Sequence, residues 1–270
     1  MATLFEQFIL GLIQGIFEWI PISSEGILIL VQSNFFNNLN LDSMLKIALL
    51  LHLGTFFAAL IYFRKDVKEL FIALKNYKHS TIETKKLLNF LIISTIVSGI
   101  IGFAIYKFVL NAAKNFTLSS KIITITIGIF LLITGYLLLT SSKKRVYDNN
   151  RTIYNLTIVD SLLLGFVQGI AVLPGLSRSG LTVSSLLLRN VDDKTSLRLS
   201  FLMSLPIVLA ANIFLNFKDL ILIKEFYIAL FFSFIFGLAT IHLLMKFAEK
   251  VKFGWFVILM ALMMILAGFI

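Results

Sequence analysis

Six apolar stretches, each about as long as a bilayer crossing requires, constrain this chain more than any other feature of its sequence. A helix needs roughly 20 predominantly apolar residues to cross the hydrocarbon core. Only 14% of the residues are charged, against about 25% in a typical soluble domain, so the chain lacks the polar surface of a water-soluble globule. We therefore expect an all-α polytopic membrane protein with about six transmembrane helices. The stretches cover residues 43–63, 87–106, 122–140, 196–215, 226–245 and 253–270.

Two further apolar stretches, residues 5–31 and 158–188, are interrupted near their middle. Pro21–Gly26 interrupts the first and Pro174–Gly180 interrupts the second, and both interruptions are rich in serine. Non-helical backbone at membrane depth is tolerated only where protein buries it or where it lines a water-filled cavity. The interruptions therefore predict two re-entrant helix pairs around a polar cavity.

The two interrupted stretches also resemble each other in sequence. The segment Gly11–Ile16 (GLIQGI) recurs as Gly165–Ile170 (GFVQGI), at an offset of 154 residues. Three predicted spans separate the copies, so the second copy enters from the opposite side of the membrane, as in transporters built from inverted repeats. We expect a single membrane domain, residues 1–270, made of inverted repeats at approximately 1–140 and 141–270.

The basic residues indicate how the chain is oriented. If the six stretches cross the membrane and the two interrupted ones turn back, 17 Lys and Arg fall in the loops of one face and five in those of the other. Basic loops favour the cytoplasmic side. This placement explains the net charge of +10 through membrane orientation, and we expect no nucleic-acid partner. The predicted location is the cell membrane. The basic loops are at 64–86, 141–157, 189–198 and 246–252.

Glu18 and Arg178 are the ionisable residues placed most deeply in apolar sequence, one in each repeat. A charge at the bilayer centre costs at least about 2.5–3.5 kcal/mol, so it is usually paired. One interpretation is a structural ion pair that joins the two broken helices. The other is functional, because Arg178 with the hydroxyls of Ser177 and Ser179 near a helix start is suited to a phosphate oxyanion.

Other polar residues of the apolar segments extend the functional interpretation. The hydroxyls of Ser23 and Ser24 lie close to Glu18 in sequence and are candidate nucleophiles or ligands, while the carboxylate is a candidate base or cation ligand. Glu25 is either a second ligand or ion-pair partner, or a solvated loop carboxylate. His52 stands in the middle of a predicted span and is either a packing residue or a base.

Two motifs resemble those of the bacterial undecaprenyl-diphosphatase family, the type associated with bacitracin resistance. The first runs from Gln14 to Ile27 (QGIFEWIPISSEGI) and the second from Pro174 to Gly180 (PGLSRSG). The second motif is complete. Flanking segments agree with the family as well: His52–Thr55, Tyr62–Asp66 and Ser200–Leu202 with Pro206.

The resemblance implies a multi-pass enzyme that removes the terminal phosphate from a polyprenyl diphosphate and regenerates the monophosphate lipid carrier of cell-wall glycan synthesis. It further implies an active site open to the outer face and the help of a divalent cation, Mg²⁺ or Ca²⁺. By position it makes Glu18, Ser24 and Arg178 catalytic. The expected substrate-binding residues are Gln14, Ser23, Gly175, Ser177 and Ser179.

The chain departs from the family pattern at three positions of the first motif. Gln14 stands in place of a glutamate, Glu25 in place of a threonine and Ile27 in place of a histidine. Either Glu18 and Glu25 together rebuild a carboxylate pair that holds the cation, or His52 substitutes as the base, or hydrolysis is lost. The last case would leave a non-catalytic polyprenyl-phosphate carrier or flippase of the same fold.

Overall fold

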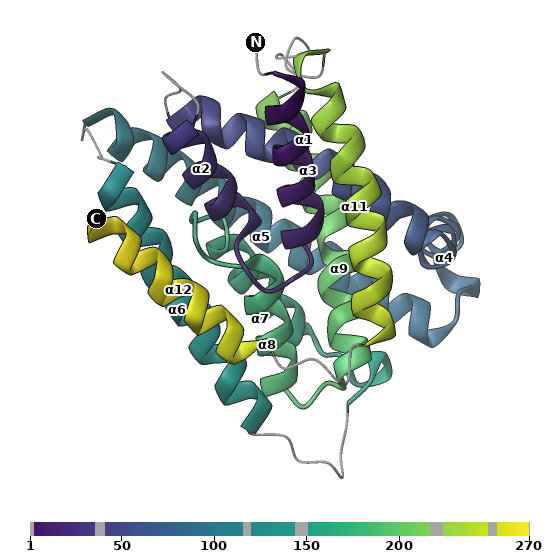
Figure 1. The fold of residues 1–270 in the computed structure, drawn as a ribbon. Helices are drawn as coiled ribbons and strands as arrows, with labels where there is room; N and C mark the ends of the chain where they lie inside the picture. Colours follow the sequence, from purple (N-terminus) through teal and green to yellow (C-terminus); the bar gives the residue numbers. More distant parts are fainter. Residues whose placement is uncertain are drawn as a thin grey trace.

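The computed structural model consists of helices joined by short connections, without a named strand among the residues that it describes (Figure 1). These residues are 3–35, 41–115, 120–143, 151–216, 224–247 and 253–269. The principal helices are α1 (Leu4–Phe17), α2 (Ser24–Phe35), α3 (Leu41–Tyr62), α4 (Arg64–Lys75), α5 (Ile82–Asn115), α6 (Ser120–Lys143), α7 (Ile158–Ile170), α8 (Arg178–Leu188), α9 (Asp193–Ala211), α11 (Tyr227–Lys246) and α12 (Gly254–Phe269), and a π-helical turn, η3 (Asn212–Asn216), continues α9.

Five helices are long and apolar enough to cross a membrane: α3, α5, α6, α9 with η3, and α11. They coincide with five of the six predicted spans, which confirms the prediction of an all-α polytopic membrane protein. The sixth predicted span is the shorter helix α12, of 16 residues, which packs along α6. Residues 144–150 and 248–252, which carry part of the predicted basic charge, lie outside the described residues.

Both interrupted apolar stretches form pairs of short helices. Residues 18–23 separate α1 from α2, and residues 171–177 separate α7 from α8. Each break contains a proline, Pro21 or Pro174, whose missing N–H and fixed φ disfavour a continuous helix. Figure 1 shows the two pairs at opposite ends of the helical bundle, with their breaks near its middle.

Each broken pair packs against a long helix from the other half of the chain. α1 lies along α11, and α7 lies along α5 (Figure 1). Glycines permit both approaches: a Cβ on Gly11 would lie 2.4 Å from the Ala229 carbonyl oxygen, and one on Gly165 would lie 2.8 Å from that of Ser94. Small residues allow such backbone contact between membrane helices. This exchange of packing partners is what inverted repeats would produce, and the boundary near residue 140 stays a prediction.

A buried carboxylate holds the second broken pair together at the ends remote from its break. Asp160 accepts hydrogen bonds from Arg151 Nη2 at 2.6 Å, from Arg189 Nε at 2.7 Å and from Thr157 Oγ1 at 2.7 Å. Burial raises the pKa of the Asp160 carboxyl, but these hydrogen bonds outweigh burial and hold that pKa below its usual range. The ionised group thus ties the start of α7 to the residue that follows α8.

The packing of α1 against α11 gives a stability prediction. A Cβ at position 15 would lie 2.6 Å from Phe236 Cβ and 2.8 Å from the Gly237 nitrogen, so Gly15→Ala must push the helices apart. We expect a loss of about 1–3 kcal/mol, seen as a lower thermal unfolding midpoint in detergent. Gly99→Ala is the control, because its nearest contact is Ile207 Cδ1 at 3.9 Å and alanine favours a helix. Equal midpoints for the two variants would contradict the close α1–α11 contact.

Candidate active site

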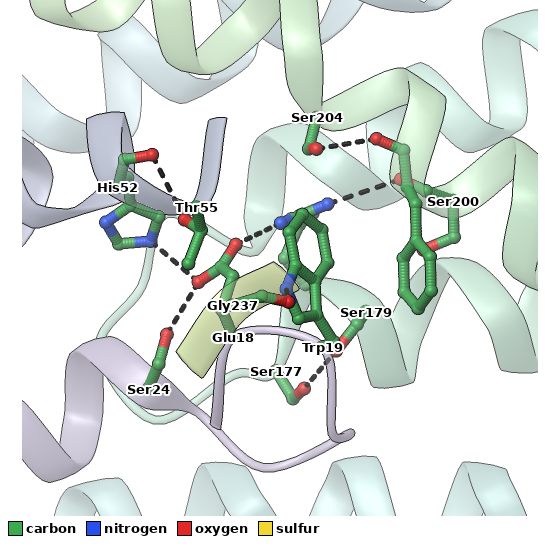
Figure 2. A network of polar contacts seen from close by, with 12 residues as sticks. Glu18, Trp19, Ser24, His52, Thr55, Ser177, Ser179, Ser200, Ser204 and Gly237 are labelled. Atoms are coloured by element: carbon green, nitrogen blue, oxygen red, sulfur yellow. Dashed lines mark hydrogen bonds and ion pairs between the residues drawn. The ribbon is translucent and has the colours of Figure 1, made fainter. Parts of the chain in front are cut away.

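The Glu18 carboxylate is the centre of the polar cluster at the meeting point of the two breaks (Figure 2). Glu18 directly follows α1, and its side chain is 4% exposed. Figure 2 shows Ser24 and His52 reaching this carboxylate from different elements. Four side chains contact it: Gln14 Nε2 at 2.9 Å, Ser24 Oγ at 2.8 Å, His52 Nε2 at 3.1 Å and Arg178 Nη2 in an ion pair. All these donors surround one carboxylate, so its position is fixed from both halves of the chain.

Arg178 is the first residue of α8, and its guanidinium reaches across to Glu18. A second nitrogen, Nη1, donates to the Ser200 carbonyl oxygen at 3.2 Å. The guanidinium carbon lies 6.0 Å from the centre of the Trp19 ring, whose Nε1 in turn donates to the Gly237 carbonyl at 3.0 Å. Arginine has five N–H donors in total, so the group retains donors for a bound anion.

His52 lies in the middle of α3 and faces Glu18. Its Nδ1 is 2.7 Å from the Ala48 carbonyl oxygen, which only accepts, so Nδ1 carries a hydrogen. The other ring nitrogen, Nε2, contacts Glu18 Oε2. A hydrogen must lie between Nε2 and Oε2 for this contact to be favourable. Thr55 Oγ1 donates to the His52 carbonyl oxygen at 3.0 Å and is 3.5 Å from Gln14 Nε2. Carboxylate and imidazole thus form a pair that shares one proton.

Backbone and serine groups tie the two breaks to each other. The Gly175 N–H donates to Ser23 Oγ at 3.2 Å, and Ser179 Oγ donates to the Ile20 carbonyl at 3.2 Å. Gly175 has a φ of +103°, and a Cβ there would lie 2.7 Å from the Ile127 Cα, so only glycine fits. The two breaks therefore behave as one structural unit at the site.

Two helices begin at this unit and direct their N-termini toward it. Ser24 is the first residue of α2, while Ser177 caps α8 by accepting the Gly180 N–H at 3.1 Å. The first N–H groups of a helix have no acceptor within the helix, and together with the helix dipole they attract anions. The arrangement is suited to a phosphate group between the two helix starts.

A cavity of about 720 Å³ extends from this cluster. Glu18, Ser24, His52 and Arg178 line its polar end, and most of the remaining wall is apolar and comes from α3, α5 and α9. Glu25 lines the cavity as well and has no hydrogen-bond partner within the described residues. The cavity therefore joins a polar end, which contains Arg178, to an apolar one.

The fit of a divalent cation depends on which carboxylates have free oxygen lone pairs. Both Glu18 oxygens are already engaged, Oε1 by Arg178 and Oε2 by Ser24 and His52 among others. Within the described part of the chain, no three His, Cys, Asp or Glu side chains are grouped to hold a metal. Glu25 is the carboxylate left for a cation, which would need further oxygens from a bound phosphate.

The structure brings together five of the predicted residues at one carboxylate: Gln14, Glu18, Ser24, His52 and Arg178. The other four predicted binding residues lie in the breaks or in the first turn of α8, where their hydrogen bonds run to the chain itself: Ser23, Gly175, Ser177 and Ser179. Sequence reasoning missed the ring of Trp19, although this residue directly follows Glu18. It also missed the Ser200 carbonyl, because no sequence pattern marks a backbone acceptor.

The fold and the cluster define a class: a helical membrane protein with a buried Glu18–Arg178 ion pair between two broken helix pairs. The profile of the bacitracin resistance protein BacA family matches residues 7–266. The chain belongs to this family.

Relatives named undecaprenyl-diphosphatase match along most of the chain. The protein from Methanococcoides burtonii is 40% identical over 274 residues and covers 100% of both chains. The one from Haloarcula marismortui is 35% identical, over 94% of this chain and 93% of its own. A third, from Syntrophotalea carbinolica, is 36% identical over 88% of this chain and 87% of its own.

Proposed function

We propose that the chain hydrolyses a polyprenyl diphosphate of the undecaprenyl type, giving the monophosphate lipid carrier and phosphate. The observation that carries the proposal is the contact of the Ser24 hydroxyl with the Glu18 carboxylate, 2.8 Å away, beside the Arg178 guanidinium. A hydroxyl next to a base and a cation is the arrangement that nucleophilic phosphoryl transfer requires. The names of the relatives supply the substrate class.

The diphosphate binds between the starts of α2 and α8. Arg178 donates its remaining N–H groups to the phosphoryl oxygens, and the first backbone N–H groups of the two helices add further donors. Because Arg178 also holds Glu18, the base and the anion-binding group keep a fixed separation. The charge that develops on the transferred group meets donors that are already in position.

The proton follows the hydrogen bonds of the cluster. Ser24 Oγ attacks the terminal phosphorus, its proton passes to Glu18, the bond to the bridging oxygen breaks, and the polyprenyl monophosphate leaves. Water then hydrolyses the phosphoserine and releases phosphate. Direct attack on the terminal phosphorus by a water molecule that Ser24 orients would give the same products. His52 Nε2, 3.1 Å from Glu18 Oε2, gives a proton to the carboxylate and takes it back. In this scheme His52 supplies the imidazole that Ile27 lacks.

A divalent cation, Mg²⁺ or Ca²⁺, would be held by Glu25 together with the phosphates of the substrate. Glu25 lines the cavity and is not engaged by hydrogen bonds of the described residues, whereas Glu18 has its oxygens occupied. When bound, the cation would neutralise charge on the diphosphate. Magnesium is commonly held by one or two carboxylates plus substrate phosphates, which a single glutamate satisfies.

The protein resides in the cell membrane, with the cavity on its outer side. The support is the basic loop at 64–86, which favours the cytoplasmic side and directly follows the end of α3. The apolar cavity wall includes Leu45, near the start of α3, and Leu215, beyond the end of α9, both at the ends remote from that side.

Phosphate release from a polyprenyl diphosphate by the purified protein in detergent tests the proposal. With Mg²⁺ or Ca²⁺ we expect release that chelator abolishes and that Arg178→Ala lacks. Ser24→Ala should lower kcat by about 10³-fold or more, because it removes the nucleophile. Ser33→Ala, on the same helix, is the matched control, since among the contacts described its hydroxyl donates to the Leu30 carbonyl at 3.1 Å and accepts from Asn34 Nδ2 at 3.4 Å, both within α2.

Each result of this assay has a defined meaning. Full release by Ser24→Ala would overturn the role of the serine. Absence of release by the native chain that still binds the lipid would overturn hydrolysis and favour the carrier or flippase. Phosphate release that persists in chelator would overturn the proposed role of a divalent cation.

A second prediction concerns the base. His52→Gln keeps a hydrogen-bonding side chain but cannot take up a proton, so kcat should fall by about 10²–10⁴-fold with KM little changed. His242→Gln is the matched control, because that imidazole is exposed and packs against the Tyr62 ring, 6.1 Å between centres. If both variants kept native kcat, His52 would be a packing residue only.

A further inference from the structure

Helix α4 lies at an edge of the bundle, directly after a membrane-spanning helix. The spanning helix α3 ends at Tyr62, and α4 begins at Arg64, with only Phe63 between them. Figure 1 shows α4 nearly end-on, so that it runs across the direction of the long helix α11. A helix that begins where the chain leaves the apolar layer, and that runs across the spanning helices, lies along the surface of the membrane.

One stripe of α4 faces the helical bundle. Residues three or four positions apart share a face of a helix, and Asp66, Leu70 and Ala73 follow this spacing. Ala73 is buried, and Leu70 packs against a buried apolar cluster that includes Phe201. Asp66 accepts a hydrogen bond from Arg198 Nε at 3.0 Å. These contacts fix the rotation of α4 about its axis, and they therefore fix where its other faces point.

The next stripe around the helix is apolar and exposed. Phe71 is 62% exposed and Leu74 is 57% exposed, and neither side chain is covered by the bundle. The opposite side of the helix carries Lys65, Glu69 and Ile72, which are exposed and mostly charged. An apolar side opposite a polar side is the pattern of a helix that lies in a membrane interface, with the apolar side in the acyl chains.

A third stripe, on the side of α4 away from the bundle, is basic. It consists of Arg64, Lys68 and Lys75, and all three are exposed. Lys68 and Lys75 lie three and four residues from Phe71, so on the helix they are its neighbours. Within the ranges that the structure describes, neither lysine has an ion-pair or hydrogen-bond partner. The basic stripe thus adjoins the apolar one, at the level where lipid headgroups meet acyl chains.

We propose that α4 binds anionic phospholipid at the membrane surface. Phe71 and Leu74 contact the acyl chains, while the basic stripe of Arg64, Lys68 and Lys75 binds the headgroup phosphates. Clusters of basic residues beside a spanning helix attract anionic lipid, and buried apolar area adds to the binding. None of these five residues lines the cavity, so the inference does not depend on the hydrolysis proposed above.

Spin labels in vesicles of phosphatidylcholine and phosphatidylglycerol test the orientation of α4. The sequence contains no cysteine, so a single introduced cysteine carries the only label. We expect a label at Leu74→Cys to be accessible to oxygen, which concentrates in lipid, and shielded from a water-soluble nickel complex. The matched control is Ile72→Cys, 51% exposed on the opposite side of the helix, which should show the reverse. Equal access of the nickel complex at both positions would overturn the proposal.

Fluorescence quenching in the same vesicles tests the preference for anionic headgroups. A fluorophore on Phe71→Cys should be quenched by phosphatidylglycerol with a nitroxide on its acyl chain at a lower mole fraction than by the corresponding phosphatidylcholine. Lys68→Gln should reduce this preference about fivefold, because a lysine close to the surface attracts anionic lipid.

Lys65→Gln is the matched control for the quenching measurement. It removes the same charge from the opposite side of α4 and should keep the preference for phosphatidylglycerol within about twofold. Both lysines are exposed, so both variants keep the fold. Equal quenching by the two lipids in the native background, or an equal loss in Lys65→Gln and Lys68→Gln, would overturn the binding of headgroups by the basic stripe.

Discussion

The ion pair between Glu18 and Arg178 joins the two broken helix pairs where their breaks meet. Each charge alone would be expensive at membrane depth, and each comes from a different broken helix pair. The two pairs must therefore meet for either charge to be tolerated. The same contact places a carboxylate and a guanidinium at one point of a cavity. The ion pair that stabilises the two broken pairs therefore also forms the site.

The breaks bring polar backbone into an apolar environment, and the structure compensates for this with short connections. Ser23 accepts a hydrogen bond from Gly175, and Ser179 donates to Ile20, so each break satisfies groups of the other. Glycine at positions 26 and 175 lets the two backbones approach over Ile127. Each unpaired N–H or C=O group would otherwise cost several kcal/mol in lipid. The free energy of unfolding of a whole domain is only about 5–15 kcal/mol, so a few such groups would cancel it.

Much of this arrangement could be predicted from sequence, because its determinants are local. Proline and glycine within apolar stretches mark the breaks, and the repeated GxxQGI segment indicates that Glu18 and Arg178 meet. The sequence leaves the role of His52 open, because that role depends on which side of α3 faces Glu18, and an almost uniformly apolar helix carries no such signal. The connecting roles of Ser23 and Ser179 could not be predicted either, since a serine that binds a ligand and one that binds backbone look alike in sequence.

A double-mutant cycle measures how strongly the Glu18–Arg178 ion pair couples the two broken helix pairs. The unfolding free energies of the native chain, Glu18→Gln, Arg178→Gln and the double variant would be measured in one detergent system. Glu18→Gln leaves the buried Arg178 charge without its carboxylate, so we expect a loss of about 3–5 kcal/mol. Arg178→Gln should cost less, because Glu18 keeps its contact with His52.

The double variant leaves no unpaired charge and should lose less than the sum of the two single losses, with a coupling on the order of 1–3 kcal/mol. The pair Glu18→Gln with Arg151→Gln is the control and should be additive, because Arg151 binds Asp160 instead. If the losses of Glu18→Gln and Arg178→Gln also added to within about 0.5 kcal/mol, the ion pair would not couple the two broken helix pairs.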